Sequence, residues 1–318
     1  MNTLSENTDT GLAMIFPGQG SQSVGMLSDL FARYPQVDET FSEASDMLGY
    51  DLWQLVSDGP ADELNQTDRT QPAMLAAGVA VWRVWLASHG PAPAVMAGHS
   101  LGEYTALVCA GAIAFTDAIS LVAERGRCMQ RAVPEGTGAM AAILGLDDEA
   151  VIDVCHAAEE GSVVTAVNFN SPGQVVIAGN AESVQRAMQL AKERGAKRAM
   201  QLPVSVPSHC DLMKPAAEQF AVQLQATTIV KPEIPVLQNV DVTAHDDPDT
   251  IRDVLAQQLY SPVQWVRTIE AMRERGITRL VEAGPGKVLA GLAKRIDRSL
   301  TAQPVFDPES LAAALDNE

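Results

Sequence analysis

At 318 residues the chain is long enough to bury a large hydrophobic core, as one large domain or one domain with an insert. Hydrophobic residues make up 47% of the sequence and aromatic residues only 5%, so we expect an aliphatic core. A formal net charge of −18 disfavours nucleic acid and anionic membranes as partners. No apolar run reaches the roughly 18 residues that span a bilayer, so a soluble protein is expected.

The four cysteines, Cys109, Cys128, Cys155 and Cys210, are widely spaced and form no CxxC pair. This spacing argues against a disulfide framework and against a zinc cluster. Residues 1–11 are polar and acidic and lack the basic-then-apolar order of a signal peptide. We therefore expect a cytoplasmic protein without a bound metal.

The first 133 residues alternate between short apolar segments and helical patterns. Strands are expected at 14–16 and 93–97. Helices are expected between these strands as far as Leu86, with breaks at Gly59-Pro60 and before Pro72, and again at 101–112 and 116–131.

The pattern changes at residues 134–138, which contain a proline and two glycines. Beyond them the expected order is strand, helix, strand, strand, helix, strand, the split βαβ arrangement of ferredoxin-like domains. We therefore expect a small inserted domain at 134–206. Its strands are expected at 139–144, 163–168, 174–178 and 197–206, and its helices at 147–160 and 182–194.

After residue 206 the first pattern resumes, and its alternation of strands and helices implies a mostly parallel sheet flanked by helices. The large α/β domain is therefore expected to be discontinuous, from 12–133 and 207–298. Residues 1–11 and 299–318 are expected to be tails. In this last part, strands are expected at 235–239 and 278–282, and helices at 210–227, 251–260, 263–275 and 286–298.

The segment Gly98-His99-Ser100-Leu101-Gly102 fits the pattern Gly-x-Ser-x-Gly and lies between an expected strand and an expected helix. In this context the pattern predicts a tight turn that exposes a nucleophilic serine hydroxyl. Glu103 follows in the first helical turn, where a negative charge suits the helix dipole. The amides that open this helix face the serine and can stabilise an oxyanion.

A serine needs a base to attack an ester or thioester at neutral pH. His209 follows an expected strand, in the kind of loop where parallel sheets collect catalytic groups. His99 is next to the serine in sequence and cannot easily fold back onto it. We expect His209 to be the base, the alternative being a helix-capping or core histidine. The remaining histidines are His89 at a helix end, His156 on a helix of the insert and His245 in an acidic turn.

No acidic residue stands in an obvious third position beside this serine and histidine. A carbonyl oxygen of the main chain, or of a Gln or Asn side chain, can accept the Nδ1–H of the base instead. Gln238, Asn239, Gln257 and Gln258 lie at element ends and are candidates, among which spacing does not choose.

Arg125 lies in the middle of the apolar face of the expected helix at 116–131. A guanidinium on such a face is costly unless it meets an anion. Its fork of N–H donors fits a carboxylate, either an internal Asp or Glu or one carried by a substrate. Beside a serine nucleophile, the pattern favours an acyl substrate with a free carboxylate.

Two glycine-rich turns fall short of phosphate-binding loops. Gly18-Gln-Gly-Ser-Gln22 does not fit GxGxxG and lacks the Lys-Ser/Thr of a P-loop, and Gly284-Pro-Gly-Lys-Val288 fails the P-loop test as well. The first turn follows a strand, so the amide of Gln19 can supply a second oxyanion donor.

Six motifs occur together in one order: Phe16-Pro-Gly-Gln-Gly-Ser-Gln22, Gly98-His-Ser-Leu-Gly-Glu103, Glu124-Arg-Gly126, Asn168-Phe-Asn-Ser-Pro-Gly-Gln174, Pro207-Ser-His-Cys210 and Glu282-Ala-Gly-Pro-Gly286. From residue 12 to residue 298 the chain resembles the malonyl-CoA:acyl-carrier-protein transacylases of bacterial type II fatty acid synthesis. The resemblance implies a hydrolase-like α/β domain with an inserted ferredoxin-like subdomain. It also implies ping-pong transfer of a malonyl group from malonyl-CoA to the phosphopantetheine thiol of holo acyl carrier protein, with no metal or redox cofactor.

The resemblance further implies a role for each residue of the site. Ser100 would carry the acyl group, and His209 would act as general base and acid. The amides of Gln19 and Leu101 would form the oxyanion hole, and Gln258 would orient His209 through a carbonyl. Arg125 would hold the carboxylate of malonate, with Gln71 and Met129 shaping the pocket.

An acidic carrier protein would need a local basic patch on this acidic chain. Lys287, Lys294, Arg295 and Arg298 gather on the expected last helix, and Lys192, Arg194, Lys197 and Arg198 form a second cluster on the insert. Both clusters fit either a carrier-protein dock or an ordinary solvated face. No apolar interface stripe is evident, so a monomer is expected.

Two other classes of protein compete with this interpretation. A serine hydrolase or thioesterase acting on acyl-CoA shares the Gly-x-Ser-x-Gly turn, but it usually carries a carboxylate in its triad and has no use for an arginine at the acyl end. A non-catalytic scaffold that binds acyl-CoA or carrier protein would need neither Ser100 nor His209.

Overall fold

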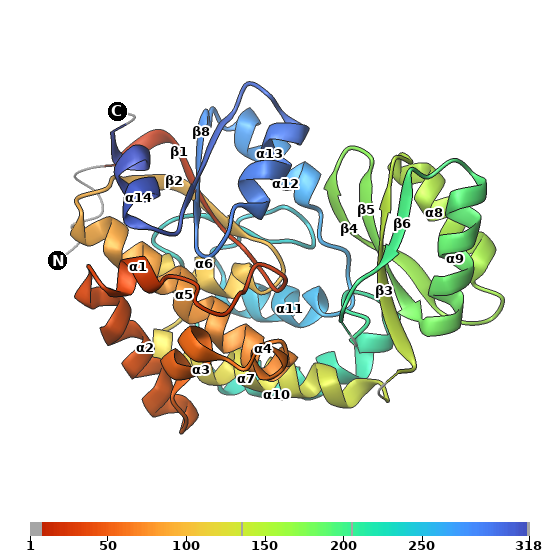
Figure 1. Cartoon of the computed structure of the whole chain (residues 1–318), viewed down its shortest axis with the longest axis horizontal. Helices are drawn as coiled ribbons and strands as arrows, with labels where there is room; N and C mark the ends of the chain where they lie inside the picture. The colour runs from red at the N-terminus through yellow and green to blue at the C-terminus, as the bar shows by residue number, and fades with distance from the viewer. Residues whose placement is uncertain (1–7, 135, 205, 317–318) are drawn as a thin grey trace.

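The computed structural model describes residues 8–134, 136–204 and 206–316, which form two parts side by side (Figure 1). The larger part is built on a five-stranded sheet of order β7-β2-β1-β8-β9, in which every pairing is parallel. Helices flank this sheet, which confirms the predicted fold class. The strands are β1 (Thr8–Phe16), β2 (Ala92–Gly98), β7 (Val236–Leu237), β8 (Arg279–Ala283) and β9 (Thr301–Val305).

Both faces of the parallel sheet are buried, so residues 12–16 of its central strand β1 are a continuous apolar run. Leu12, Met14 and Phe16 of β1 belong to the larger hydrophobic core, while Ala13 and Ile15 belong to a second core on the opposite face. The helices of the larger part are α1 (Ser28–Phe31), α2 (Pro35–Leu48), α3 (Leu52–Asp58), α4 (Ala61–Leu64), α5 (Thr67–Ala87), α6 (Gly102–Cys109), α7 (Phe115–Ala132), α10 (Lys214–Ala226), α11 (Pro248–Gln258), α12 (Trp265–Glu274), α13 (Val288–Ile296) and α14 (Pro308–Leu315), with a 3₁₀ turn η1 at Asp211–Met213.

The predicted break before Pro72 is wrong, because helix α5 runs through this proline without interruption. A proline inside a helix removes one hydrogen bond, to the carbonyl four residues earlier. Here the helix is buried along most of its length and packs against α2 and α7. Tertiary packing therefore outweighs the local preference at this position.

The prediction of a tail at 299–318 is also wrong. β9 pairs with β8 along its whole length, and α14 follows it with a capping box at Asp307. Pro304 is tolerated because β9 is an edge strand of the sheet. At the other end, residues 8–11 of the predicted N-terminal tail are part of β1, whereas residues 1–7 lie outside the described residues.

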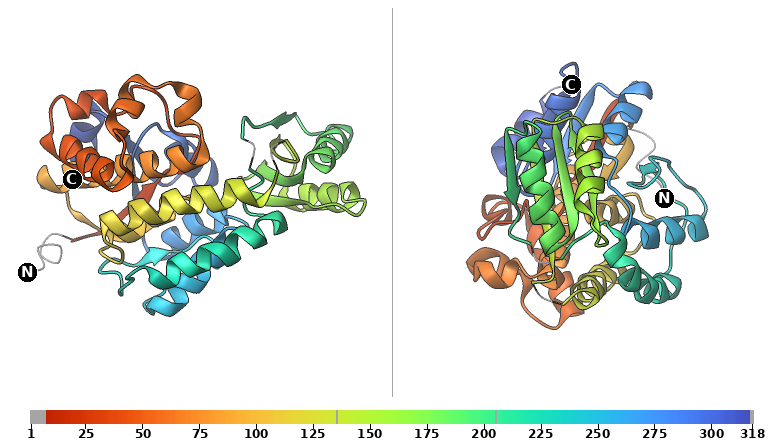
Figure 2. Two further views of the ribbon diagram at one scale, coloured as in Figure 1. Left: turned by 90° about the horizontal axis from the view of Figure 1, so that it is seen from below. Right: turned by 90° about the vertical axis from the view of Figure 1, so that its right-hand side faces the viewer.

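The smaller part is an antiparallel sheet of order β4-β5-β3-β6. Helices α8 and α9 cover its outer face, away from the larger part (Figure 2). The chain order of strands and helices is the one expected for a split βαβ unit. The last strand is shorter than predicted, because pairing ends at Gln201. The elements are β3 (Gly138–Leu144), α8 (Asp148–Ala158), β4 (Val164–Ser171), β5 (Gln174–Asn180), α9 (Ala181–Glu193) and β6 (Arg198–Gln201).

Candidate active site

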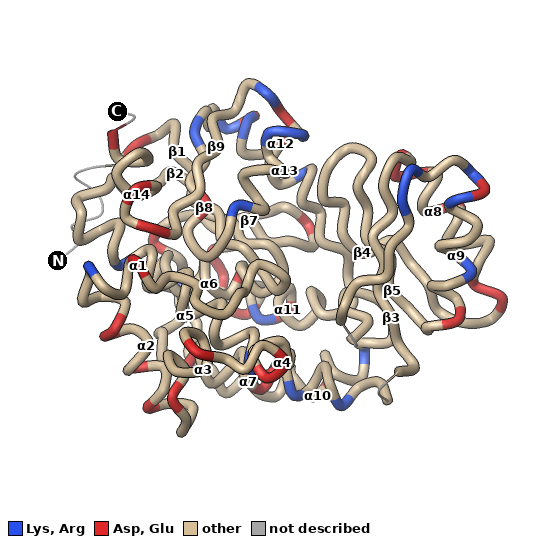
Figure 3. Tube along the Cα trace, viewed as in Figure 1, with Lys and Arg blue, Asp and Glu red and all other residues tan. Residues whose placement is uncertain are grey.

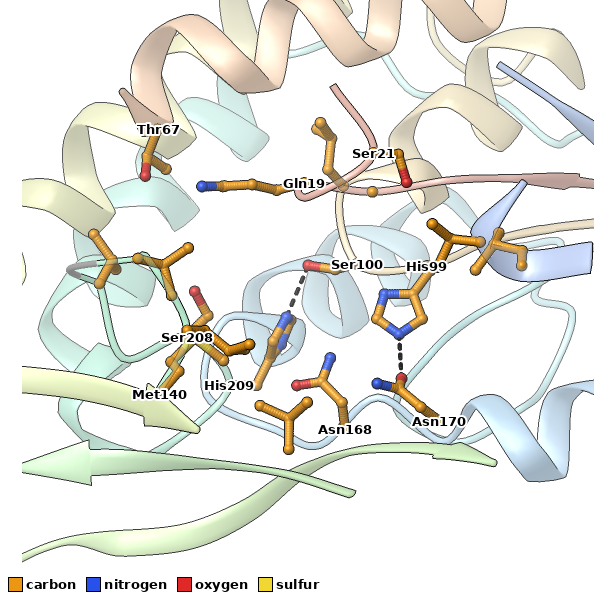
Figure 4. A pocket seen from close by; sticks show the side chains of 18 of the residues that line it. Gln19, Ser21, Thr67, His99, Ser100, Met140, Asn168, Asn170, Ser208 and His209 are labelled. Atoms are coloured by element: carbon orange, nitrogen blue, oxygen red, sulfur yellow. Dashed lines mark hydrogen bonds between the residues drawn. The ribbon is translucent and has the colours of Figure 1, made fainter. Parts of the chain in front are cut away.

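A cleft with a cavity volume of about 200 Å³ lies where the two parts meet. Its walls come from the turns after β1 and β2, from α7 and α13, from the inner face of the antiparallel sheet and from the loop before α10. Ser100, His209 and Arg125 all line it. Figure 4 shows the labelled side chains converging on this space.

Ser100 is held at a sharp turn between β2 and α6, with φ of 52°. A Cβ at Gly98 would lie 1.8 Å from the carbonyl carbon of Gly102, and a Cβ at Gly102 would lie 2.1 Å from the carbonyl oxygen of Phe16. Only glycine therefore fits on either side of the serine. The Asn239 side chain braces the turn, because its Oδ1 accepts from Ser100 N at 2.7 Å and its Nδ2 donates to the Gly98 carbonyl at 2.7 Å.

His209 lies 109 residues from Ser100 in the chain, and its Nε2 is 2.7 Å from Ser100 Oγ. Its Nδ1 is 2.8 Å from the main-chain carbonyl oxygen of Gln258. A carbonyl oxygen only accepts, so Nδ1 carries the proton and Nε2 is free to accept from the serine hydroxyl. Among the described residues, no hydrogen bond joins the candidates Gln238 and Asn239 to His209; both donate to Glu103 instead.

Burial and the nearby positive charge of Arg125 together lower the pKa of His209 to about 3, although the hydrogen bond to the Gln258 carbonyl acts in the opposite direction. A histidine with a pKa this far below neutrality is an uncharged imidazole at physiological pH. It is therefore in the protonation state that a general base requires.

The turn after β1 meets the turn that holds Ser100. A Cβ at Gly18 would lie only 2.4 Å from the His99 carbonyl oxygen, so this contact requires glycine. Gln19 and Leu101 both line the cleft. Within residues 8–134, 136–204 and 206–316, neither of their amide N–H groups has a hydrogen-bond acceptor. Two free amides at converging turns beside a serine can stabilise an oxyanion.

Arg125 is only 1% exposed, yet it forms no ion pair with any described carboxylate. Its Nη1 donates to Gln71 Oε1 at 2.8 Å and its Nη2 donates to Gln258 Oε1 at 2.9 Å. Its Nε has no partner among the described residues. The sequence left two possible partners for this arginine, an internal carboxylate or a substrate carboxylate. Among the described residues, the structure excludes the internal salt bridge. A buried cation in a cleft without an anionic partner can bind a ligand carboxylate.

The two residues expected beside Arg125 differ in position. Met129 lines the cleft, whereas Gln71 lies behind the guanidinium and is 1% exposed. Gln71 holds Arg125 through its carbonyl oxygen, and its amide nitrogen lies 3.6 Å from Met129 Sδ. Gln71 therefore fixes the arginine and does not form the wall of the cavity.

Three further residues of the cleft region were not predicted from the residues themselves. His99 points into the cleft and its Nε2 lies 2.8 Å from Asn170 Oδ1 (Figure 4). Burial lowers the pKa of His99, which favours the uncharged form of this second histidine as well. Asn168 lines the cleft with its Oδ1 buried and unpartnered within the described part of the chain. The only sequence signal for this segment was the motif at residues 168–174, one of the six motifs on which the family resemblance rests.

Glu103 is the third, and it is fully buried behind the nucleophile. It accepts from the side chain of Gln258 at 2.9 Å, from the main-chain nitrogen of Asn239 at 2.8 Å and from the side chain of Gln238 at 3.2 Å. Burial raises its pKa to about 7, although these hydrogen bonds favour the ionised form. The helix-dipole argument placed Glu103 in the first turn of α6 but did not indicate these long-range partners.

A nucleophile turn on a parallel sheet, with an uncharged histidine on its serine, defines the class of serine acyl hydrolases and acyltransferases. Within this class, the chain belongs to the acyl transferase domain family, whose match spans residues 13–308. Among the described residues, no group of three or more His, Cys, Asp or Glu is placed to hold a metal ion. No helix there is long and apolar enough to cross a membrane.

Curated relatives match nearly the whole chain. It is 60% identical over 307 residues to the malonyl CoA-acyl carrier protein transacylase of Escherichia coli, covering 96% of this chain and 99% of that protein. It is 63% identical over 302 residues to the protein of the same description in Haemophilus influenzae, covering 95% and 97%.

Solved structures agree with the fold. An acyl carrier protein S-malonyltransferase from Vibrio cholerae superposes with a TM-score of 0.93 at 60% identity, covering 95% of this chain and 99% of that one. A malonyl-transacylase solved in complex with its type II PKS acyl-carrier protein superposes with a TM-score of 0.96 at 57% identity, covering 96% and 99%.

Proposed function

We propose that this chain transfers a malonyl group from malonyl-CoA to the phosphopantetheine thiol of acyl carrier protein, in fatty acid biosynthesis. The observation that carries the proposal is the pairing, in one cleft, of a serine–histidine dyad with a buried arginine that lacks an anionic partner. The dyad supplies acyl transfer, and the arginine selects an acyl group with a free carboxylate. The curated relatives from Escherichia coli and Haemophilus influenzae, which match nearly the whole chain, are described as malonyl CoA-acyl carrier protein transacylases.

In the first half-reaction Ser100 Oγ attacks the thioester carbonyl of malonyl-CoA while His209 Nε2 takes the hydroxyl proton. The tetrahedral oxyanion is stabilised by the amides of Gln19 and Leu101. When the C–S bond breaks, the imidazolium returns the proton to the CoA sulfur. This leaves a malonyl ester on Ser100 and free CoA.

The second half-reaction runs the same steps in reverse. The phosphopantetheine thiol attacks the ester carbonyl while His209 takes the thiol proton, and that proton then goes to Ser100 Oγ as the ester bond breaks. The products are malonyl-carrier protein and free enzyme. The main-chain carbonyl of Gln258 keeps the Nδ1–H of His209 in place throughout, in the role that a carboxylate has in a triad. No cofactor beyond the two substrates is needed.

A direct comparison of transfer and hydrolysis tests the proposal. The protein is incubated with malonyl-CoA and holo carrier protein, and the carrier protein is analysed by mass spectrometry while free malonate is measured in parallel. We expect malonyl-carrier protein to account for the CoA released. Release of CoA as free malonate, with the carrier protein unmodified, would identify a thioesterase instead.

The carrier protein is proposed to dock at helix α13, one wall of the cleft. Val288, Leu289 and Leu292 of this helix line the cavity, and Arg295 donates a hydrogen bond at 2.7 Å to Gln174 of β5, which lines it as well. Lys and Arg residues gather around α12 and α13, whereas Asp and Glu are frequent along α2, α3 and α4 (Figure 3). A local basic patch attracts an acidic partner even on an acidic protein. The proposed dock comprises Lys287, Lys294, Arg295 and Arg298.

Charge reversal on α13 tests this dock. The double variant Lys294→Glu, Arg295→Glu is expected to raise KM for holo carrier protein by about ten-fold, because it replaces attraction with repulsion. The rate of acyl loading from malonyl-CoA should change by less than about two-fold, as measured by rapid quench. The matched control, Lys192→Glu with Arg194→Glu on the second cluster, should leave KM unchanged. An unchanged KM in the α13 variant would remove this helix as the dock.

The uncharged state of His209 is open to direct measurement. Because burial and Arg125 lower its pKa to about 3, its ring should stay neutral between about pH 8 and about pH 5. The test is an NMR titration of ring-labelled histidines, in which the His209 resonance is assigned by its absence from His209→Gln. No shift is expected over this range. A midpoint near the ordinary histidine value would contradict the assignment of His209 as a desolvated base.

We further propose that the protein acts in the cytoplasm and as a monomer. All four cysteines are buried free thiols, which suits a reducing compartment. The proposed catalytic residues all come from one chain, so the cleft needs no second copy to complete it.

A further inference from the structure

Glu103 is a buried carboxyl group without a cationic partner at ion-pair distance among the described residues. Its three hydrogen-bond donors are neutral groups of Gln258, Asn239 and Gln238. A buried carboxylate held only by neutral donors costs free energy, which points to a functional role. The acyl-transfer steps above make no direct use of it.

Gln258 connects Glu103 to both ends of the proposed reaction. Its Nε2 donates to Glu103 Oε2 at 2.9 Å, and its Oε1 accepts from Arg125 Nη2 at 2.9 Å. Its Nε2 also lies 3.1 Å from the Ser100 carbonyl oxygen, and its own main-chain carbonyl receives His209 Nδ1. One residue thus touches the nucleophile, the base and the arginine.

The charge of Glu103 fixes which way the Gln258 amide points. A carboxylate only accepts and a guanidinium only donates, so the amide must turn its NH₂ to Glu103 and its oxygen to Arg125. Such a chain of hydrogen bonds is mutually polarised. It anchors one arm of the guanidinium without an ion pair. A direct Glu–Arg pair would occupy the donors that a substrate carboxylate needs.

We propose that Glu103 is a positioning residue that holds Arg125 through Gln258 and thereby sets the preference for acyl groups with a free carboxylate. This inference rests on the proposed malonyl transfer. It assigns Glu103 to the selection of the acyl group, in addition to its support of the turn at Ser100 through Asn239.

The test is Glu103→Gln, which keeps the size of the side chain but removes its charge and adds a donor. Loading rates from malonyl-CoA and acetyl-CoA are measured by rapid quench at about pH 8, above the pKa of Glu103. We expect kcat/KM for malonyl-CoA to fall at least about ten-fold more than kcat/KM for acetyl-CoA. Glu103→Asp, which restores the carboxylate, should recover part of the lost preference.

The control is Glu282→Gln, which removes a second glutamate that is fully buried among the described residues. Glu282 accepts hydrogen bonds from the amides of Leu289 and Ala290, and no hydrogen bond among the described residues joins it to Arg125 or Gln258. Its loss should leave the malonyl-to-acetyl ratio within about two-fold of the wild-type value. Equal losses for both acyl groups in Glu103→Gln would show a merely structural role and overturn the proposal.

A second variant keeps the proposal testable if Glu103→Gln does not fold. Gln258→Leu preserves the main-chain carbonyl that receives His209 but breaks the link to Arg125, so it should give the same selective loss for malonyl-CoA. An unchanged ratio in this variant would also overturn the proposal. A wild-type protein that fails to load malonyl-CoA at all would instead refute the proposed function.

Discussion

Replacing Ser100 with alanine is expected to lower the rate of malonyl transfer by at least about 10⁴-fold, the scale of loss seen when a covalent nucleophile is removed. The hydroxyl is 2.7 Å from its base, and among the described residues no other serine or threonine hydroxyl is hydrogen-bonded to His209. The measurement is the steady-state rate of malonyl-carrier protein formation from malonyl-CoA.

Ser100→Gly separates the effect of losing the hydroxyl from the effect of the strained main-chain conformation at this position. Ser100 has φ of 52°, which glycine adopts without the cost that a Cβ incurs. The glycine variant should therefore be as inactive as Ser100→Ala while its thermal stability is no lower. Residual transfer near the wild-type rate in either variant would contradict a covalent role for this serine.

The second large effect is expected at Arg125. Arg125→Ala should lower kcat/KM for malonyl-CoA by about 10²- to 10³-fold, because charge-assisted bidentate contacts to the malonate carboxylate are lost. Acetyl-CoA has no such carboxylate, so its kcat/KM should stay unchanged or rise. The variant should then prefer acetyl-CoA over malonyl-CoA. The measurement is competition between the two thioesters, with the acyl-enzyme masses compared.

Arg127→Ala is the matched control for this arginine. Arg127 lies two residues further along the same helix, where it pairs with Glu124 at 3.2 Å on the exposed side. Its removal should leave both rates within about two-fold of wild type. A malonyl preference that survives in Arg125→Ala would contradict the assignment of Arg125 to the malonate carboxylate.

The sequence predicted those parts of the site that local pattern can mark. Ser100 stands in a five-residue motif between a strand and a helix, and Arg125 interrupts the apolar face of a helix. Both positions can therefore be recognised from their neighbours in the sequence. His209 was reached by excluding four other histidines, and the structure places its Nε2 at the serine. The split βαβ order of the insert followed from strand and helix periods alone.

Long-range pairing accounts for what sequence reasoning missed. The contacts of Glu103 with Gln238, Asn239 and Gln258 span 135 to 155 residues, and no spacing rule links such positions. Spacing left Gln258 as one of four candidates to orient His209, and only the family resemblance indicated it, because the carbonyl that receives His209 belongs to the main chain. The strand β9 is short and contains Pro304, which argues against a strand unless its edge position is known.

The central claim is a covalent malonyl ester on Ser100. Its most direct test is mass spectrometry of the intact protein after brief incubation with malonyl-CoA, followed by peptide mapping, with Ser100→Ala in parallel. The account predicts one added malonyl group, located on the peptide that carries Ser100 and absent from the variant. CoA release without any adduct, or an adduct that persists in Ser100→Ala, would contradict it.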